Sequence, residues 1–361
     1  MKLEEIDKNF KPIEIDGMKF EFYPVNLAPF VVEGFPWKHP QKEYYRLPAD
    51  MTAADVNEGA LELANNTTGG AIRFRTDSKV IAIRADLIYS HDLPHMPKIA
   101  QNGFDCYRLD GVDPHFVGIS RAPELLNCHL ETTVARDLDG ELSLFQVNMP
   151  LIGAAEHIEI GVLPGSQLLP PTPHRIKKPI LFYGSSITHG ACASRPGNCY
   201  PSALCRAFDA PQINLGFAGC GRGEPAVARA IASLDLTAFV FDYDHNAPNA
   251  EHLRKTHEPF FRIIRDAHPE LPILMLSRCN FYPRVNHDDI ERRAIIRQTY
   301  ENAVRAGDCN VAFIDGETLF AGDRRWDCTV DLCHPNDLGF YRMATVIEPV
   351  LRKLIENSTS K

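Results

Sequence analysis

The stretch 179–190 is Pro179-Ile180-Leu181-Phe182-Tyr183-Gly184-Ser185-Ser186-Ile187-Thr188-His189-Gly190. Its first half is a short apolar run typical of a buried strand, and the glycine after it allows a tight turn into a helix. A serine at the start of that helix can expose its hydroxyl, while unpaired backbone N–H groups can stabilise an oxyanion. A simple Ser/Thr helix cap is the competing interpretation.

The chain after this stretch alternates apolar runs with helical patterns. Further buried strands are expected at 212–215, 238–242, 273–276 and 311–314. Helices are expected at 223–233, 250–268, 288–306 and 337–357. This alternation predicts an α/β domain with a doubly wound parallel sheet covered by helices on both faces.

The chain before this stretch has a different rhythm. Residues 18–165 contain evenly spaced short strands with turn signals between them, which predicts a β-sandwich or jelly roll. The Pro-rich segment Leu168–His174 is a stiff connector. We therefore expect two domains, a β-sandwich over 1–170 and an α/β domain over 175–361.

Composition limits the class of protein. A chain of 361 residues suits two domains. Its formal net charge of −9 argues against a nucleic-acid partner. No apolar run approaches the ~20 residues that span a bilayer, and the charged start Met1–Lys8 lacks the apolar core of a signal peptide. We expect a cytoplasmic protein without a membrane partner, whose ten cysteines are free thiols. Packing of the sandwich face on a second copy would give a homo-oligomer.

Two further segments follow expected strands, at the edge of a parallel sheet where ligands bind. In Asn214–Gly221, Gly219 can bring a bare backbone N–H towards the site. In Asp242–Pro248, Asn246 can donate its side-chain amide to an oxyanion. A Gly-rich loop and a polar turn are the competing interpretations. A calcium loop is rejected, because Ala247 replaces the required glycine and Leu253 stands where the closing glutamate belongs.

The last segment, Asp331–Asp337, precedes the final helix. His334 is a candidate general base, and Asp331 three residues earlier can hold its imidazole in the correct tautomer. Metal ligation by this Asp-x-x-His is the alternative, but no second ligand cluster completes a site, so we expect no metal. Together the segments supply a nucleophile, oxyanion donors, a base and an orienting carboxylate, as an acyl-transfer site requires.

This ordered set resembles the SGNH (GDSL-type) hydrolases. Ser186 matches the nucleophile, Gly219 and Asn246 match the glycine and asparagine blocks, and Asp331 and His334 match the last block. Ser185 replaces the usual aspartate, and the usual surround of Asn246 is absent. Gly103-Phe104-Asp105-Cys106-Tyr107 is similar to the Gly-x-Asp-x-Tyr signature of the sandwich domain that precedes some SGNH esterases. The resemblance implies a flavodoxin-like sheet, ester hydrolysis without a cofactor, an oxyanion hole of Ser186, Gly219 and Asn246, and relatives among carbohydrate acetylesterases and polyketide tailoring enzymes.

The expected substrate is a small-molecule ester with a short acyl group, such as acetyl, on a sugar or another polar alcohol. Polar side chains near the motifs suit a hydroxyl-rich leaving group, and we expect substrate contacts from His189, Arg195 and His245. Arg222 adds to this polar surround. Two alternatives remain open at this stage: an O-acyltransferase with the same residues, and a carbohydrate-binding protein without catalysis.

Overall fold

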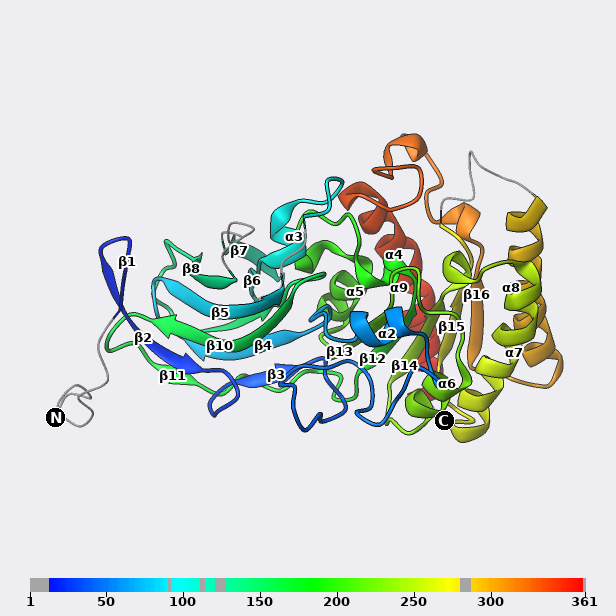
Figure 1. Ribbon diagram of the computed structural model, residues 1–361, viewed down its shortest axis with the longest axis horizontal. Helices are drawn as coiled ribbons and strands as arrows, with labels where there is room; N and C mark the ends of the chain where they lie inside the picture. Colours follow the sequence, from blue (N-terminus) through cyan, green and yellow to red (C-terminus); the bar gives the residue numbers. More distant parts are fainter. Residues whose placement is uncertain (1–12, 90–91, 111–113, 121–127, 280–286, 360–361) are drawn as a thin grey trace.

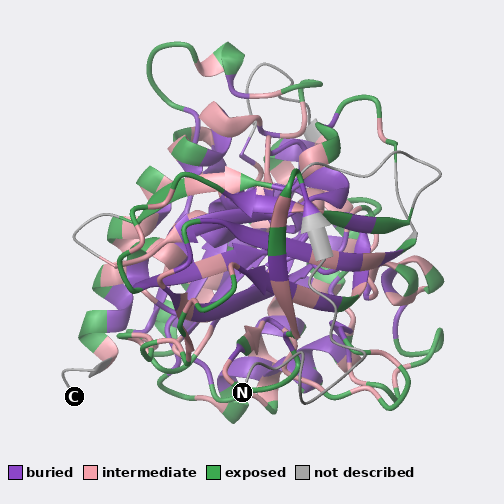
Figure 2. Cartoon of the chain, turned by 90° about the vertical axis from the view of Figure 1, so that its left-hand side faces the viewer, coloured by how far each residue is buried: buried purple, intermediate pink, exposed green. Residues whose placement is uncertain are grey.

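The computed structural model describes residues 13–89, 92–110, 114–120, 128–279 and 287–359. Antiparallel strands occupy the first half of the chain, and a parallel sheet with helices occupies the second (Figure 1). The two parts lie side by side along the long axis of the molecule (Figure 1). Buried residues follow the sheets through the interior (Figure 2).

The first half consists of two antiparallel sheets. One has the order β1(Ile13–Ile15), β2(Met18–Pro24), β10(Ala154–Val162), β5(Ile81–Tyr89) and β8(His129–Ala135). The other has the order β11(Leu168–Leu169), β4(Ala71–Thr76), β9(Ser143–Asn148), β6(Asp105–Arg108) and β7(His115–Ile119), with β3(Val31–Glu33) also paired to β4. Inward-facing side chains of both sheets, such as Ile83, Phe74 and Phe145, form one apolar core, as expected for a sandwich.

The second half contains one parallel sheet. Its strand order is β13(Gln212–Gly216), β12(Ile180–Gly184), β14(Ala238–Asp242), β15(Ile273–Leu276) and β16(Val311–Ile314). Every expected strand of this half is therefore present within a residue or two, in a mixed α/β fold.

Helices cover both faces of this sheet, and the alternation along β12 shows why. Ile180 and Phe182 pack into the core beneath α5(Tyr200–Phe208) and α9(Asp337–Thr359). Leu181 and Tyr183 pack into the opposite core beneath the remaining long helices. Those helices are α6(Pro225–Ala232), α7(Ala250–Ala267) and α8(His287–Arg305).

Three helices were not expected from the sequence. They are α2(Glu58–Leu63), α3(Lys98–Asn102) and α5. The first two are too short to show helical periodicity. The third has Pro201 in its first turn, where proline is tolerated because its missing N–H has no intrahelical role. Leu168–Leu169, expected in the connector, instead form β11 against β4.

The first half of the chain also reaches onto the second. Tyr45, Val56 and Ala60 are part of the core beneath α6 and α7. The fully buried guanidinium of Arg46 donates hydrogen bonds to four backbone carbonyls. Two belong to its own segment, Leu63 and Asn66, and two belong to β13, Asn214 and Gly216, each 2.9 Å away. The division near residue 170 thus separates two kinds of sheet but not two independent cores.

Within the described residues, no helix has the length and apolar character needed to cross a membrane.

Arg46→Ala should destabilise the whole molecule. The change leaves several buried carbonyls without donors, and a hydrogen bond to a charged group contributes about 1.5–3 kcal/mol, so we expect a loss on the order of 3 kcal/mol or more in the free energy of unfolding. Denaturant unfolding measures it. Arg254→Ala is the matched control, because that guanidinium pairs with Glu291 at the surface and such pairs contribute at most about 1 kcal/mol. Equal losses in the free energy of unfolding for the two variants would contradict the inference that Arg46 holds the two halves of the chain together.

Candidate active site

The turn after β12 separates the roles of two adjacent serines. A Cβ atom on Gly184 would lie 2.1 Å from the carbonyl oxygen of Asp242, so only glycine fits there. Ser185 is fully buried and caps α4(Ser186–His189), since its hydroxyl accepts the N–H of Ile187 at 3.2 Å. Ser186 is partly exposed. The helix-cap interpretation therefore applies to Ser185, and the hydroxyl that does not cap the helix belongs to Ser186.

Ser186, His334 and Asp331 form a continuous chain of hydrogen bonds. Ser186 Oγ lies 2.8 Å from His334 Nε2, and His334 Nδ1 lies 2.7 Å from Asp331 Oδ2. The other carboxylate oxygen accepts the backbone N–H groups of Cys333 and His334 at 3.0 and 2.7 Å. Leu332 has a φ of 66°, which turns the chain back and brings aspartate and histidine together.

Electrostatics fix the protonation of this chain. Burial alone would raise the pKa of Asp331, but hydrogen bonds from His334 and Cys333 lower it to about 2. The ionised carboxylate therefore holds a proton on Nδ1 of His334 and leaves the lone pair on Nε2. That lone pair faces the Ser186 hydroxyl and can accept its proton.

Gly219 and Asn246 lie beside each other at the ends of β13 and β14. Asn246, in the 3-10 turn η2(Asp244–Asn246), accepts the N–H of Gly219 at 3.1 Å and donates to the carbonyl of Phe217 at 2.7 Å. These partners fix the amide orientation, because a flipped amide would oppose donor to donor and acceptor to acceptor. One amide hydrogen of Asn246 remains available for an oxyanion. Ser186, as the first residue of α4, has a backbone N–H without an intrahelical acceptor.

Two buried carboxylates, those of Asp242 and Asp244, lie next to this part of the site and bond to its neighbouring segments. Asp244 accepts the backbone N–H of Arg278 at 3.0 Å. Asp242 accepts hydroxyl hydrogens from Thr188 and Tyr200 at 3.2 and 3.3 Å. Burial, together with the neighbouring aspartate, raises the pKa of Asp242 to about 7. Burial also raises the pKa of Asp244 to about 6. Neither carboxylate is placed to join His334 as a metal ligand.

The three residues expected to contact substrate have partners within the protein. His189 is fully buried, and its Nε2 is 2.7 Å from the carbonyl of Leu151 in the first domain, so a substrate cannot reach it. His245 is partly buried and lies beside the last loop, with Nδ1 4.0 Å from the Cys333 sulfur. Burial, with the nearby charges of Arg278, His334 and Arg292, lowers the pKa of His245 well below its usual value.

Arg195 is the third of these residues, and it holds the two domains together. Its guanidinium lies 2.9 Å from Asp105, also donates to the Tyr107 hydroxyl, and stacks 4.0 Å from the Phe116 ring. Asp105 is fully buried and also accepts the N–H of Gly197 at 2.8 Å. The Gly-x-Asp-x-Tyr signature thus binds the loop after α4. Sequence alone gave no indication of this partnership.

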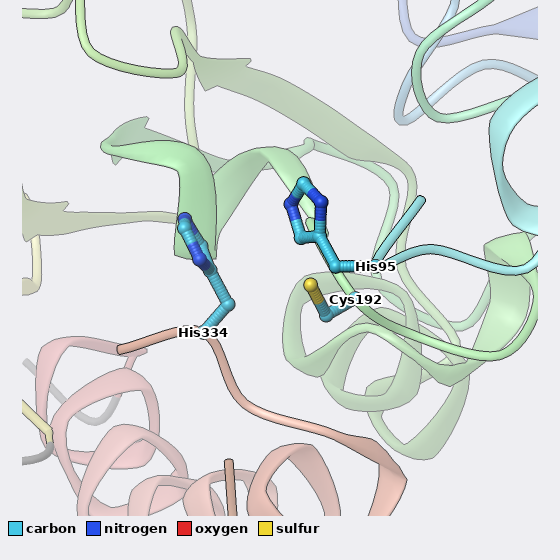
Figure 3. Close-up of side chains that lie close together, drawn as sticks. All are labelled: His95, Cys192 and His334. Atoms are coloured by element: carbon cyan, nitrogen blue, oxygen red, sulfur yellow. The ribbon is translucent and has the colours of Figure 1, made fainter. Parts of the chain in front are cut away.

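The structure adds His95 and Cys192 to the surroundings of His334. His95 comes from the first domain and Cys192 from the turn after α4 (Figure 3). One ligand atom from each, with one from His334, lies within 4.8 Å of the others. Burial, with the charges of Asp331 and Cys333, raises the pKa of Cys192 to about 12, so its thiol is neutral and no rival to Ser186 as a nucleophile. No sequence spacing could reveal this group, because its members lie about a hundred residues or more apart.

Comparison with known protein families agrees with this geometry. Residues 177–352 match the GDSL-like lipase/acylhydrolase family, and residues 20–168 match the N-terminal domain of SGNH-hydrolase-type esterases. The chain therefore belongs to the GDSL-type (SGNH) hydrolases and is an ester hydrolase of that family. No curated protein matched the sequence.

Solved structures share the fold over both halves of the chain. A protein of Bacteroides ovatus described as a GDSL-like lipase is 27% identical, with a TM-score of 0.83 over 93% of this chain and 98% of its own. A salicylyl-acyltransferase from a tetracycline biosynthetic pathway is 19% identical, with a TM-score of 0.74 over 93% and 97%. An acetyl xylan esterase of the rumen bacterium Butyrivibrio proteoclasticus is 11% identical, with a TM-score of 0.55 over 92% and 98%. The last two likenesses concern the fold alone.

Asn246→Ala should lower kcat by about 10²–10³-fold, the cost of losing one oxyanion donor. KM should change little, because the lost hydrogen bond forms with charge that develops only in the transition state. Steady-state kinetics with an aryl acetate measures both constants. Asn249→Ala is the control, because that side chain only caps α7. A change confined to KM would make Asn246 a substrate-positioning residue.

Asp242 should make the protein less stable as pH rises. Its pKa is about 7 in the folded protein against a usual 3.8, so between these values the folded state binds more protons than the unfolded state. The free energy of unfolding therefore falls as pH increases through this range. Asp242→Asn keeps a neutral group beside Thr188 and Tyr200, so its Tm should fall by a few degrees less than that of the wild type between pH 5 and 8. Thermal unfolding curves that shift in parallel would disprove a raised pKa.

Proposed function

We propose that this protein is a serine esterase that removes short acyl groups, acetyl above all, from a carbohydrate or another polar alcohol. The observation that carries the proposal is the hydrogen-bonded chain from Ser186 through His334 to Asp331. Its members follow β12 and precede α9, at the edge where ligands bind in open α/β sheets. The strand order, 2-1-3-4-5 along the chain, supports a flavodoxin-like arrangement of this sheet.

In the proposed reaction, His334 first accepts a proton and then donates it. Nε2 of His334 takes the Ser186 proton while Oγ attacks the ester carbonyl, and Asp331 stabilises the imidazolium that results. The oxyanion is held by the N–H of Ser186 and the free amide hydrogen of Asn246, and by the N–H of Gly219 once it leaves its resting bond to Asn246. The imidazolium then protonates the leaving alcohol. Water, deprotonated by His334, releases the acid from the acyl-enzyme.

A shallow surface groove beside His95 and Cys192 contains groups that can hydrogen-bond to a leaving alcohol. Its volume is about 490 Å³, and its lining includes Ser194, Arg324, Asp327, Asn336 and Asp337. The lining also contains Pro97, Val330 and Leu338, so the groove offers apolar contacts beside its hydrogen-bonding groups, as small-molecule sites commonly do. The acetyl xylan esterase that shares this fold makes acetylated sugars the first substrates to test.

An O-acyltransferase is the second candidate, and the fold shared with a salicylyl-acyltransferase favours it. The two functions differ in whether water or an alcohol attacks the acyl-enzyme. Here the side chain of Asp331 is 36% exposed and that of His334 is 21% exposed. Water therefore reaches the base directly, which supports hydrolysis.

A series of p-nitrophenyl esters, run beside acetylated xylo-oligosaccharides, tests the proposal. Rates should fall steeply beyond about four acyl carbons, because a site shaped for a short acyl group clashes with a longer one, and no burial gain of ~0.8 kcal/mol per methylene offsets the clash. Acetylated sugars should be turned over by the wild type and not by Ser186→Ala. Adding acceptor alcohols identifies acyl transfer by its ester product. Preference for chains of roughly eight or more carbons, where each methylene adds burial, would reject the sugar ester as substrate.

A further inference from the structure

We propose that His95, Cys192 and His334 form a zinc-binding site that inhibits the enzyme by sequestering its general base. The three side chains come from the first half of the chain, from the turn after α4 and from the last loop, and they lie close together (Figure 3). Two imidazoles and one thiol are ligands that Zn²⁺ prefers. Zinc binding itself does not require turnover, whereas its inhibitory effect rests on the proposed role of His334 as the base.

The hydrogen bond from His334 to Asp331 prepares this imidazole for a metal. Nδ1–H is donated to the carboxylate at 2.7 Å, so Nε2 carries the free lone pair. A carboxylate on the far nitrogen of a zinc-bound histidine fixes its orientation and increases its basicity. The feature that makes Nε2 a base towards Ser186 therefore also makes it a strong zinc ligand. A metal bound there would prevent proton transfer from Ser186.

The other two ligands are held in place by their own surroundings. His95 lies between Leu93 and Met96, and the buried side chain of Gln101 bonds both backbones: it accepts from Leu93 N–H at 2.8 Å and donates to the Met96 carbonyl at 2.8 Å. The Met96 side chain is anchored in the core beneath α5 and α9. The His95 ring is itself exposed and free to rotate, with its centroid 6.0 Å from that of His334.

Cys192 lies in a left-handed turn with φ 72° just beyond the C-terminus of α4. Its thiol would lose its proton to solvent on binding zinc, as coordinated thiols do. The three ligand atoms now lie within 4.8 Å of one another. Tetrahedral zinc, with bonds of about 2.0–2.3 Å, brings ligand atoms to about 3.5 Å, so a contraction of about 1 Å is needed. Rotation of the exposed His95 ring can supply most of it, and solvent can fill the fourth position.

Zinc inhibition of p-nitrophenyl acetate hydrolysis tests the site. Each variant is titrated with ZnCl₂ in buffer free of chelators and normalised to its own zinc-free rate. His95→Ala and Cys192→Ser should each raise the half-inhibitory zinc concentration by at least about 10-fold, since even loss of an outer hydrogen-bond partner costs that much metal affinity. His157→Ala, an exposed histidine of the sandwich, is the control and should match the wild type. Equal inhibition of all variants, or none of the wild type, would overturn the proposal.

A second measurement is independent of esterase activity. Co²⁺ added to Ser186→Ala should produce a thiolate-to-cobalt charge-transfer band, and Cys192→Ser in the same background should abolish it. If the buried Cys192 variant fails to fold, His95→Ala in the same background provides the test and should weaken the cobalt band. An exposed ring can be removed without loss of packing. Absence of the cobalt band in folded Ser186→Ala would refute the metal site and leave the proposed esterase function untouched.

Discussion

The contact between Gly184 and the carbonyl oxygen of Asp242 is the constraint on which the site depends. The two strands β12 and β14 approach so closely there that a Cβ atom would lie 2.1 Å from that oxygen. The chain must turn at once, which buries Ser185 as a helix cap and leaves Ser186 exposed. The choice of Ser186 over Ser185 as the proposed nucleophile therefore rests on backbone packing, since both serines carry the same hydroxyl.

The first domain supports this geometry at three places. Arg46 ties its segment to the end of β13, immediately before the Gly219 loop. Asp105 and Arg195 fix the loop after α4, where Cys192 lies. His95 is brought to within reach of His334. Through these contacts the sandwich helps to position the active site. Every group assigned to acyl transfer nevertheless comes from the second half of the chain.

The alternation of apolar runs and helices predicted the parallel sheet well, because buried strands such as β14 have a continuous apolar sequence. The motifs of Ser186, His334 and Asp331 could also be recognised, since they follow or precede regular elements, and the structure brings these three side chains together. Contacts with substrate could not be predicted. Arg195 and His189 have the residue types of binding groups, but one bonds Asp105 and the other the Leu151 carbonyl, from segments far away in the sequence. Polar residues near a motif can make structural contacts as well as ligand contacts, and only tertiary packing separates the two.

Covalent labelling with a fluorophosphonate, followed by peptide mass mapping, tests the central claim most directly. The reagent reacts with a serine only when a base activates it and an oxyanion site accepts the phosphoryl oxygen. The account predicts one adduct, on Ser186, which disappears in His334→Ala and persists in Ser185→Ala. An adduct on Ser185, or labelling of Ser186 that does not depend on His334, would contradict it.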